Sequence, residues 1–140
     1  MTDLQIAKNN LNGHTLCLVK DGNCLFSTLK GIAPMMNFIA ESTPLEGYCA
    51  ADLVVGKAAA MLFARCGIRE VFAKTLSEAG KAVLEKYKIR YEYETLTAKI
   101  INRAGTDVCP MEKAVTGIDD FNEAYCILKE KLQAIRAANP

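Results

Sequence analysis

The sequence contains no run of eighteen apolar residues, so none of its segments is expected to cross a membrane as a helix. The longest apolar segment, LVVGKAAAMLFA, is interrupted by Gly56 and Lys57. The first residues, MTDLQIAKNN, lack the basic start and the apolar run of a signal peptide. We therefore expect a cytoplasmic location and no membrane partner.

Neither sign of charge predominates in this chain. Its 140 residues include 17 basic and 16 acidic side chains, which gives a formal net charge of +1. A chain without a basic excess lacks the electrostatic footprint of proteins that bind nucleic acid. We expect no nucleic-acid partner.

Signatures of metal sites and of nucleophilic catalysis are also scarce. No CxxC pair occurs, so a zinc ribbon or a thioredoxin-type site is not expected. The single histidine, His14, opens a predicted strand and has no evident partner for a Ser-His-Asp or Cys-His arrangement. The six cysteines are scattered through apolar neighbourhoods, a pattern that indicates buried thiols rather than a disulfide framework.

The composition is that of an ordinary globular protein. Hydrophobic residues make up 51% of the chain and charged residues 24%, and 140 residues are enough to bury a sizeable core. No internal repeat, linker or low-complexity tract divides the chain. We predict a single domain over residues 1–140.

Local patterns predict the order of the secondary-structure elements. Thr2 and Gln5 have capping-box spacing, which predicts an opening helix. Asp21-Gly22 lies between HTLCLVK and NCLFSTL, the strongest short signal for a hairpin. IRYEYE alternates as a half-exposed strand does. The remaining predictions are helices over 32–41, 51–65 and 77–87, a buried strand over 69–76, and two helices that begin after Cys109 and Asp120.

Strands separated by helices indicate a layered α/β domain with some parallel strand pairing. The hairpin adds an antiparallel part to the sheet. The segment from Leu53 to Phe63 is more apolar than one sheet face requires, which favours a homo-oligomer. A covering helix from the same chain explains that pattern equally well.

Two predicted helix starts concentrate polar groups. They are Tyr48-Cys49-Ala50-Ala51-Asp52 and Cys109-Pro110-Met111-Glu112-Lys113. A helix N-terminus exposes unpaired backbone N–H groups and a partial positive charge, which suit anions and thiolates. If both starts lie at the same edge of the sheet, they form a pocket.

Each of these starts also has a purely structural interpretation. Pro110 is favoured at a first helical position, and Glu112 has the spacing of a capping-box acid, yet cysteine is a poor cap. Asp52 is either an acid that complements the helix dipole or a partly buried carboxylate with a role in a site. Lys57 is interpreted as a side chain that extends to solvent.

The segments ADLVVGKAAA and IINRAGTDVCPMEKAV resemble a bacterial and archaeal family known as "domain of unknown function 1893". The resemblance covers most of the chain from the hairpin to Val115. It implies a cytidine-deaminase-like fold, which is a three-layer α/β/α sandwich with a mixed sheet. The order of elements derived from the local patterns agrees with such a fold.

Zinc deaminases of that fold use an H-x-E motif and a P-C-x-x-C motif at two helix starts. The segment from Cys49 to Asp52 resembles the first motif, but its acid comes one residue late and is Asp. The segment from Cys109 to Glu112 resembles the second with proline and cysteine exchanged, and Glu112 stands where a second thiolate belongs. We therefore predict that the zinc site is lost and that no cofactor is bound. A degenerate zinc deaminase with Cys49, Cys109 and Glu112 as ligands is the alternative.

The leading functional hypothesis is a metal-free, deaminase-like domain that binds a nucleotide- or nucleoside-like small molecule between the two helix starts. The loop before the second start supplies an amide, a guanidinium and a hydroxyl that suit such a ligand. An enzyme with Cys109 as nucleophile, activated by the helix N-terminus and Lys113, is a second hypothesis, and whether any reaction is catalysed stays open. The predicted ligand-binding residues are Cys49, Asp52, Asn102, Arg103, Thr106, Glu112 and Lys113.

Overall fold

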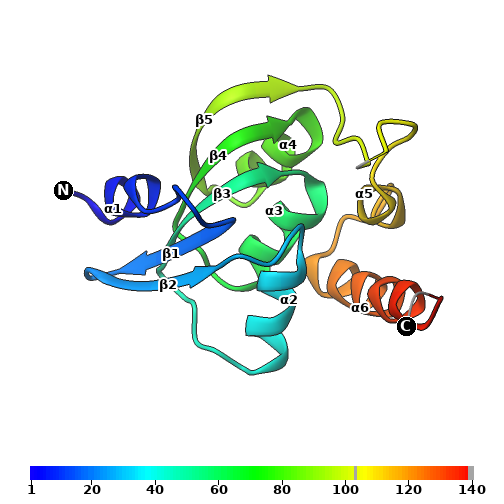
Figure 1. The fold of residues 1–140 in the computed structure, drawn as a ribbon, viewed down its shortest axis with the longest axis horizontal. Coiled ribbons are helices and arrows are strands. Elements are labelled where there is room, and N and C mark those ends of the chain that lie inside the picture. The colour runs from blue at the N-terminus through cyan, green and yellow to red at the C-terminus, as the bar shows by residue number, and fades with distance from the viewer. Residues whose placement is uncertain (103, 139–140) are drawn as a thin grey trace.

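A mixed five-stranded sheet forms the centre of the molecule (Figure 1). The structure is a computed structural model that describes residues 1–102 and 104–138. The strand order is β2-β1-β3-β4-β5; β1 is antiparallel to both of its neighbours, and β3, β4 and β5 are parallel. The strands are β1 (Leu16–Lys20), β2 (Asn23–Ser27), β3 (Cys49–Val55), β4 (Glu70–Ser77) and β5 (Arg90–Thr97).

Helices cover both faces of this sheet, which confirms the predicted three-layer α/β/α arrangement (Figure 1). One face is covered by α1, which packs over Cys17, Val19 and Phe72. The larger core lies on the other face, beneath the remaining described helices. The helices are α1 (Asp3–Asn9), α2 (Ala33–Ala40), α3 (Lys57–Arg65), α4 (Glu78–Lys86), α5 (Pro110–Ala114) and α6 (Phe121–Ala138).

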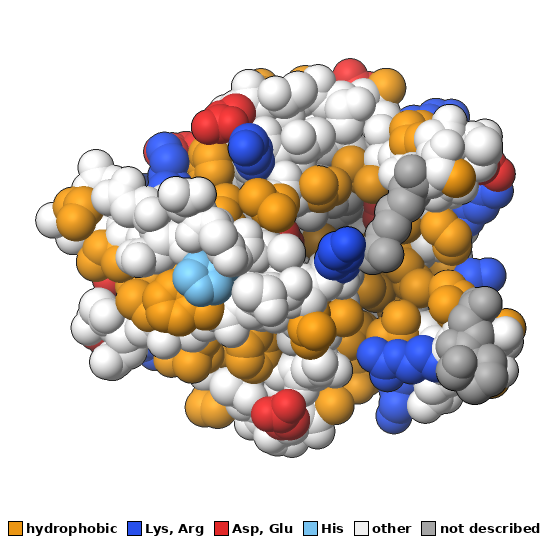
Figure 2. Space-filling model, viewed as in Figure 1, with side chains coloured by type: hydrophobic (Ala, Val, Ile, Leu, Met, Phe, Trp, Pro, Cys, Tyr) orange, Lys and Arg blue, Asp and Glu red, His pale blue; other side chains and the backbone are white. Residues whose placement is uncertain are grey.

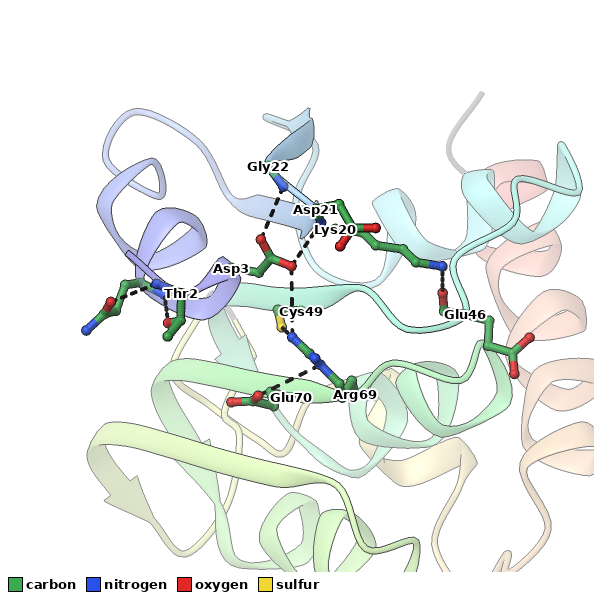
Figure 3. Close-up of polar contacts among 10 residues, drawn as sticks. Thr2, Asp3, Lys20, Asp21, Gly22, Glu46, Cys49, Arg69 and Glu70 are labelled. Atoms are coloured by element: carbon green, nitrogen blue, oxygen red, sulfur yellow. Dashed lines mark hydrogen bonds and ion pairs between the residues drawn. The ribbon is translucent and has the colours of Figure 1, made fainter.

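The N-terminal helix begins with the predicted capping box and is attached to the predicted hairpin. The N–H of Gln5 donates to Thr2 Oγ1 at 3.2 Å, and the N–H of Thr2 donates to Gln5 Oε1 at 2.9 Å. The Asp3 carboxylate accepts the N–H groups of Asp21 and Gly22 at 2.9 and 3.2 Å (Figure 3). Both turn residues have positive φ, as a two-residue hairpin turn requires.

The prediction of one helix over 51–65 is wrong. Residues Cys49–Val55 form β3, and the helix begins only at Lys57. A strand buried on both faces between parallel and antiparallel neighbours is apolar throughout, just as a buried helix is. Gly56 is the N-cap of α3 and separates the two elements. Cys49 and Asp52 therefore lie in a strand and not at a helix start.

The other predicted elements are present. Pro34 lies in the first turn of α2, Ser77 caps α4, and the Glu123 N–H donates to Asp120 Oδ2 at 2.8 Å where α6 begins. β5 lies at the edge of the sheet, and most of its residues are exposed, more than its alternating sequence predicted.

The apolar segment from Leu53 to Phe63 is covered within the chain. Its buried residues Met61, Leu62 and Phe63 pack into the core beneath α2, α4 and α6. The observation that favoured a homo-oligomer thus has an intramolecular explanation, and the oligomeric state stays a prediction. Among the described residues, no helix has both the length and the apolar character needed to cross a membrane.

Candidate functional site

The carboxyl ends of the three parallel strands meet at one edge of the sheet, where α3 and α4 begin. Ligands of open α/β sheets bind outside this edge, because the following helices present their N-termini there. Ser77 ends β4 and caps α4, since its Oγ accepts the Gly80 N–H at 3.0 Å. The N-terminus of α3 has a different partner.

That partner is the Glu112 carboxylate, which comes from α5. Glu112 Oε1 accepts the Lys57 N–H at 2.7 Å, and Oε2 accepts the Ala58 N–H at 2.8 Å. Two unpaired amides of α3 are thus satisfied by an internal anion at the positive end of the helix. Hydrogen bonds of this charge-assisted kind are stronger than neutral ones. The capping-box interpretation of Glu112 is therefore wrong: its carboxylate caps α3 and not α5.

Glycine at residue 56 makes room for this carboxylate. A Cβ atom added to Gly56 would lie 2.2 Å from Glu112 Oε1, well inside van der Waals contact. The same tight packing recurs beside it, because a Cβ on Gly80 would lie 2.9 Å from the Val55 carbonyl oxygen. The starts of α3 and α4 can approach each other and α5 only with these two small residues.

A cavity of about 400 Å³ opens beside this junction. Three lysines contribute to its walls: Lys57 at the start of α3, Lys99 after β5, and Lys113 on α5. Ala98 and Val108 add apolar wall. On the face seen in Figure 2, basic side chains gather on the side of the molecule where α5 and α6 lie. The cavity therefore combines cationic and apolar surface.

The loop between β5 and α5 is held by its own side chains. Asn102 Oδ1 accepts the Thr106 N–H at 3.0 Å, and Asn102 Nδ2 donates to Thr106 Oγ1 at 3.2 Å. Lys113 pairs with Asp107, and this ion pair lowers the pKa of the Asp107 carboxyl. Two predicted ligand-binding side chains, Asn102 and Thr106, thus bond each other, whereas Arg103 lies outside the described residues.

Cys109 lies where the sequence predicts a helix to begin. It is the N-cap residue of α5, with Pro110 at the first helical position. Its side chain is half-buried and makes no cap hydrogen bond, whereas its N–H donates to the Ile100 carbonyl at 2.9 Å. His14 stacks on Phe26, and its Nδ1 lies 2.9 Å from the carbonyl oxygen of Asn10, the C-cap of α1, so it belongs to a different part of the fold.

Cys49 lies at the opposite end of β3 from this junction. The seven-residue strand is about 20 Å long at roughly 3.3 Å per residue, and it separates Cys49 from Gly56. The Cys49 thiol is fully buried, and Arg69 Nη2 donates to its sulfur at 3.3 Å (Figure 3). Burial is the largest influence on the Cys49 thiol, and its pKa is raised although the Arg69 guanidinium acts to lower it. The predicted pocket between residues 48–52 and 109–113 is therefore wrong, because α3 begins at the other end of the strand.

Asp52 lies in the middle of β3, between Leu16 of β1 and Ala73 of β4. Its side chain is buried, as the sequence suggested, and it is absent from the walls of the cavity. Removal from water raises the pKa of the Asp52 carboxyl to about 8, and hydrogen bonds from the backbone of Val54 and Leu53 offset only part of this shift. Near neutral pH this carboxyl is mostly protonated.

The described residues do not bring together the zinc ligands considered from the sequence. Within the described ranges 1–102 and 104–138, no group of three His, Cys, Asp or Glu side chains is close enough to hold a metal. Of the three ligands considered from the sequence, Cys49 is buried at the far end of β3, and Glu112 uses both oxygens on backbone amides. Cys109 is left without the other two.

Sequence reasoning missed Lys57 and Lys99 as wall residues. The sequence predicts Lys57 to lie inside a longer helix and to extend to solvent. One sequence pattern could have placed Lys57 at a helix start, namely Gly56-Lys57 after an apolar run. A glycine in that position can separate a buried strand from the helix that follows it. Lys99 lies just beyond the alternating strand, and no local sequence pattern indicates that it lines a cavity.

Comparison with known proteins finds one family model and two solved structures that resemble this chain. A family model described as "Domain of unknown function (DUF1893)" matches residues 6–132. The crystal structure of a DUF1893 family protein from Thermotoga maritima is 23% identical and covers 94% of this chain and 91% of its own, with a TM-score of 0.84. A dCMP deaminase from the cyanophage S-TIM5 is 14% identical over 64% of this chain and 92% of its own, with a TM-score of 0.46. No curated protein matches the chain.

The Thermotoga structure shares the fold of this chain, and the predicted mixed α/β architecture and the predicted family resemblance are both confirmed. The likeness to the deaminase is too partial to carry an argument about chemistry.

Proposed function

The chain belongs to the DUF1893 family, and we propose that it binds a small anionic, nucleotide-like molecule without a metal ion, in the cavity at the carboxyl ends of β3, β4 and β5. The observation that carries this proposal is the set of lysines around one cavity: Lys57, Lys99 and Lys113. The proposed site differs from the one inferred from the sequence alone, because α3 begins at Lys57.

The charge balance in the cavity favours an anion. Glu112 is the acidic side chain in the walls, and its charge is already engaged by two backbone N–H groups. Lys113 is paired with Asp107, but both side chains are exposed, and such surface pairs exchange partners at little cost. Lys57 and Lys99 make no ion pair within the described part of the chain. Two cations are therefore available to a phosphate group.

The apolar walls of the cavity suit the part of a nucleotide-like molecule other than its phosphate. Ala98, Ile100 and Val108 offer a surface against which a planar ring can pack. A volume of about 400 Å³ lies within the usual range of small-molecule sites, roughly 300–1,000 Å³. A phosphate near the lysines and a ring on the apolar wall would use both kinds of surface.

Calorimetric titration with nucleoside monophosphates, diphosphates and the matching nucleosides tests the proposal. We expect binding by at least one nucleotide and weaker binding by its nucleoside, because the lysines act on the phosphate. Lys57→Met and Lys99→Met should each weaken nucleotide binding about tenfold, or about 1.4 kcal/mol.

Lys129→Met on the exposed surface of α6 is the matched control, because it removes the same charge from a residue that does not line the cavity. Absence of heat for every nucleotide at millimolar concentration would contradict the proposal. Equal weakening by Lys129→Met would also contradict it, since the effect would then reflect overall charge.

A further inference from the structure

Arg65 is a cation with unused hydrogen-bonding capacity among the residues that the structure describes. It lies in the last turn of α3, and its Nε–H is buried without a hydrogen-bond partner. Among the described residues, it also makes no ion pair. Burying a charged donor without a partner is costly, so proteins normally pair such groups. Within the described residues, the Arg65 guanidinium therefore lacks an anionic partner.

An aromatic ring fixes the plane of this guanidinium. Its central carbon lies 4.3 Å from the centroid of the Tyr125 ring on α6. The contact is a cation–π interaction and partly stabilises the charge. The ring face offers no oxygen to the Nε–H, so stacking orients the guanidinium and leaves its edge unpaired.

Arg65 lines a second cavity, of about 340 Å³, which is separate from the lysine-lined one. Three parts of the chain meet there: Ser42 and Thr43 after α2, Arg65 and Cys66 at the end of α3, and Tyr125 on α6. Among the described residues, its walls contain the hydroxyl-bearing side chains of Ser42, Thr43 and Tyr125 and no carboxylate. A negatively charged group is the component that the cavity lacks.

We propose that this cavity binds the carboxylate group of a small molecule, with Arg65 as the anchoring residue. The planar guanidinium carries its two terminal Nη groups side by side, and their N–H groups can donate in parallel to the two oxygens of a carboxylate. The hydroxyls of Ser42 and Thr43 are additional donors, and Ile39 and Leu45 provide apolar contact for the rest of the molecule.

A monoanion fits this position better than a phosphate dianion does. Both α2 and α3 end beside the cavity, and helix C-termini carry partial negative charge. Part of that charge is offset by capping bonds, since Ser42 and Thr43 donate their N–H groups to the carbonyls of Ile39 and Phe38 at 3.0 Å each. The single charge of Arg65 is balanced by one carboxylate.

An amide-resolved NMR titration of the full chain with acetate, butyrate and benzoate, at ionic strength held constant with chloride, tests this proposal. We expect saturable shifts at the amides of Ser42, Thr43, Cys66 and Tyr125, with the larger carboxylates bound more tightly. Arg65→Lys keeps the charge but loses the parallel donors, and should weaken binding at least about tenfold. Arg65→Met should abolish the shifts.

Arg65→Met is expected to fold, because the half-buried Arg65 makes no ion pair among the described residues whose loss would destabilise the protein, and Met keeps an apolar stem of similar length. The double variant Lys57→Met/Lys99→Met should keep the carboxylate shifts, which separates this site from the proposed nucleotide site. Unchanged shifts in Arg65→Met would overturn the proposal. Phosphate that shifts these amides while carboxylates do not would overturn it as well.

Discussion

The Glu112 carboxylate lies where a side chain on residue 56 would have to be. A Cβ on Gly56 would be 2.2 Å from Glu112 Oε1, and the same oxygen accepts the next N–H along the chain, that of Lys57, at 2.7 Å. The strand-to-helix junction after β3 and the short helix α5 are therefore adapted to each other. This relationship has consequences for stability that can be measured.

Gly56→Ala should destabilise the protein by roughly 1–3 kcal/mol, the usual cost of overfilling a packed site. The methyl group has to displace the Glu112 carboxylate from the α3 amides, and those hydrogen bonds are then lost. Urea unfolding measures the change. A double-mutant cycle with Glu112→Ala is the control, because the clash disappears when the carboxylate is absent. Fully additive effects would contradict the direct contact.

Glu112→Ala should expose the start of α3 to solvent. Removal of two hydrogen bonds to a charged acceptor should lower the free energy of unfolding by about 2 kcal/mol. Hydrogen exchange at the Lys57 and Ala58 amides should accelerate, because both lose their acceptor. Glu123→Ala, on the exposed surface of α6, is a matched control and should leave exchange at these two amides unchanged. If Glu112→Ala leaves exchange at both amides as it is in the unaltered protein, the capping role is wrong.

Asp52 should make stability fall as pH rises. The carboxyl has a pKa of about 8 in the folded protein and a model value of 3.8, so between these values the folded state holds a proton that the unfolded state has released. The free energy of unfolding then decreases with rising pH, by at most about 1.4 kcal/mol per pH unit from this group.

Asp52→Asn should remove this dependence while its side-chain oxygen still accepts the backbone N–H groups. We expect the variant to gain stability over the unaltered protein progressively from pH 4 to pH 8, with urea unfolding as the measurement. A stability difference that does not change with pH would show that Asp52 is ionised in the folded state throughout this range.

Cys49 should resist alkylation in the folded protein. Its thiol is fully buried and its pKa is raised, and the thiolate is the reactive form. Iodoacetamide labelling followed by peptide mass spectrometry should show Cys126 modified well before Cys49, since Cys126 is exposed. Labelling in urea should remove the difference. Equally rapid labelling of both thiols without denaturant would contradict the buried position.

Sequence patterns that span only a few residues were sufficient to predict much of this fold. The Thr2–Gln5 capping box and the Asp21-Gly22 turn each depend on hydrogen bonds or backbone angles within four residues. The cap at Ser77 is of the same kind, and so is Pro110 at the start of α5. Alternation in the IRYEYE segment also survives in the structure, because a strand places successive side chains on opposite faces whatever lies around it.

The sequence by itself determined these local elements and the α/β class of the domain, but the tertiary structure decided what residues 49–55 are. A mostly buried apolar run satisfies a strand and a helix equally, and its pairing with β1 and β4 makes it a strand. That choice moves Cys49 and Asp52 away from the helix start and brings Lys57 to it. The tertiary structure also decided the role of Glu112, because its hydrogen-bond partners lie 55 and 54 residues earlier in the chain. No local pattern encodes such a contact, because it forms only when α5 folds back over the end of the sheet.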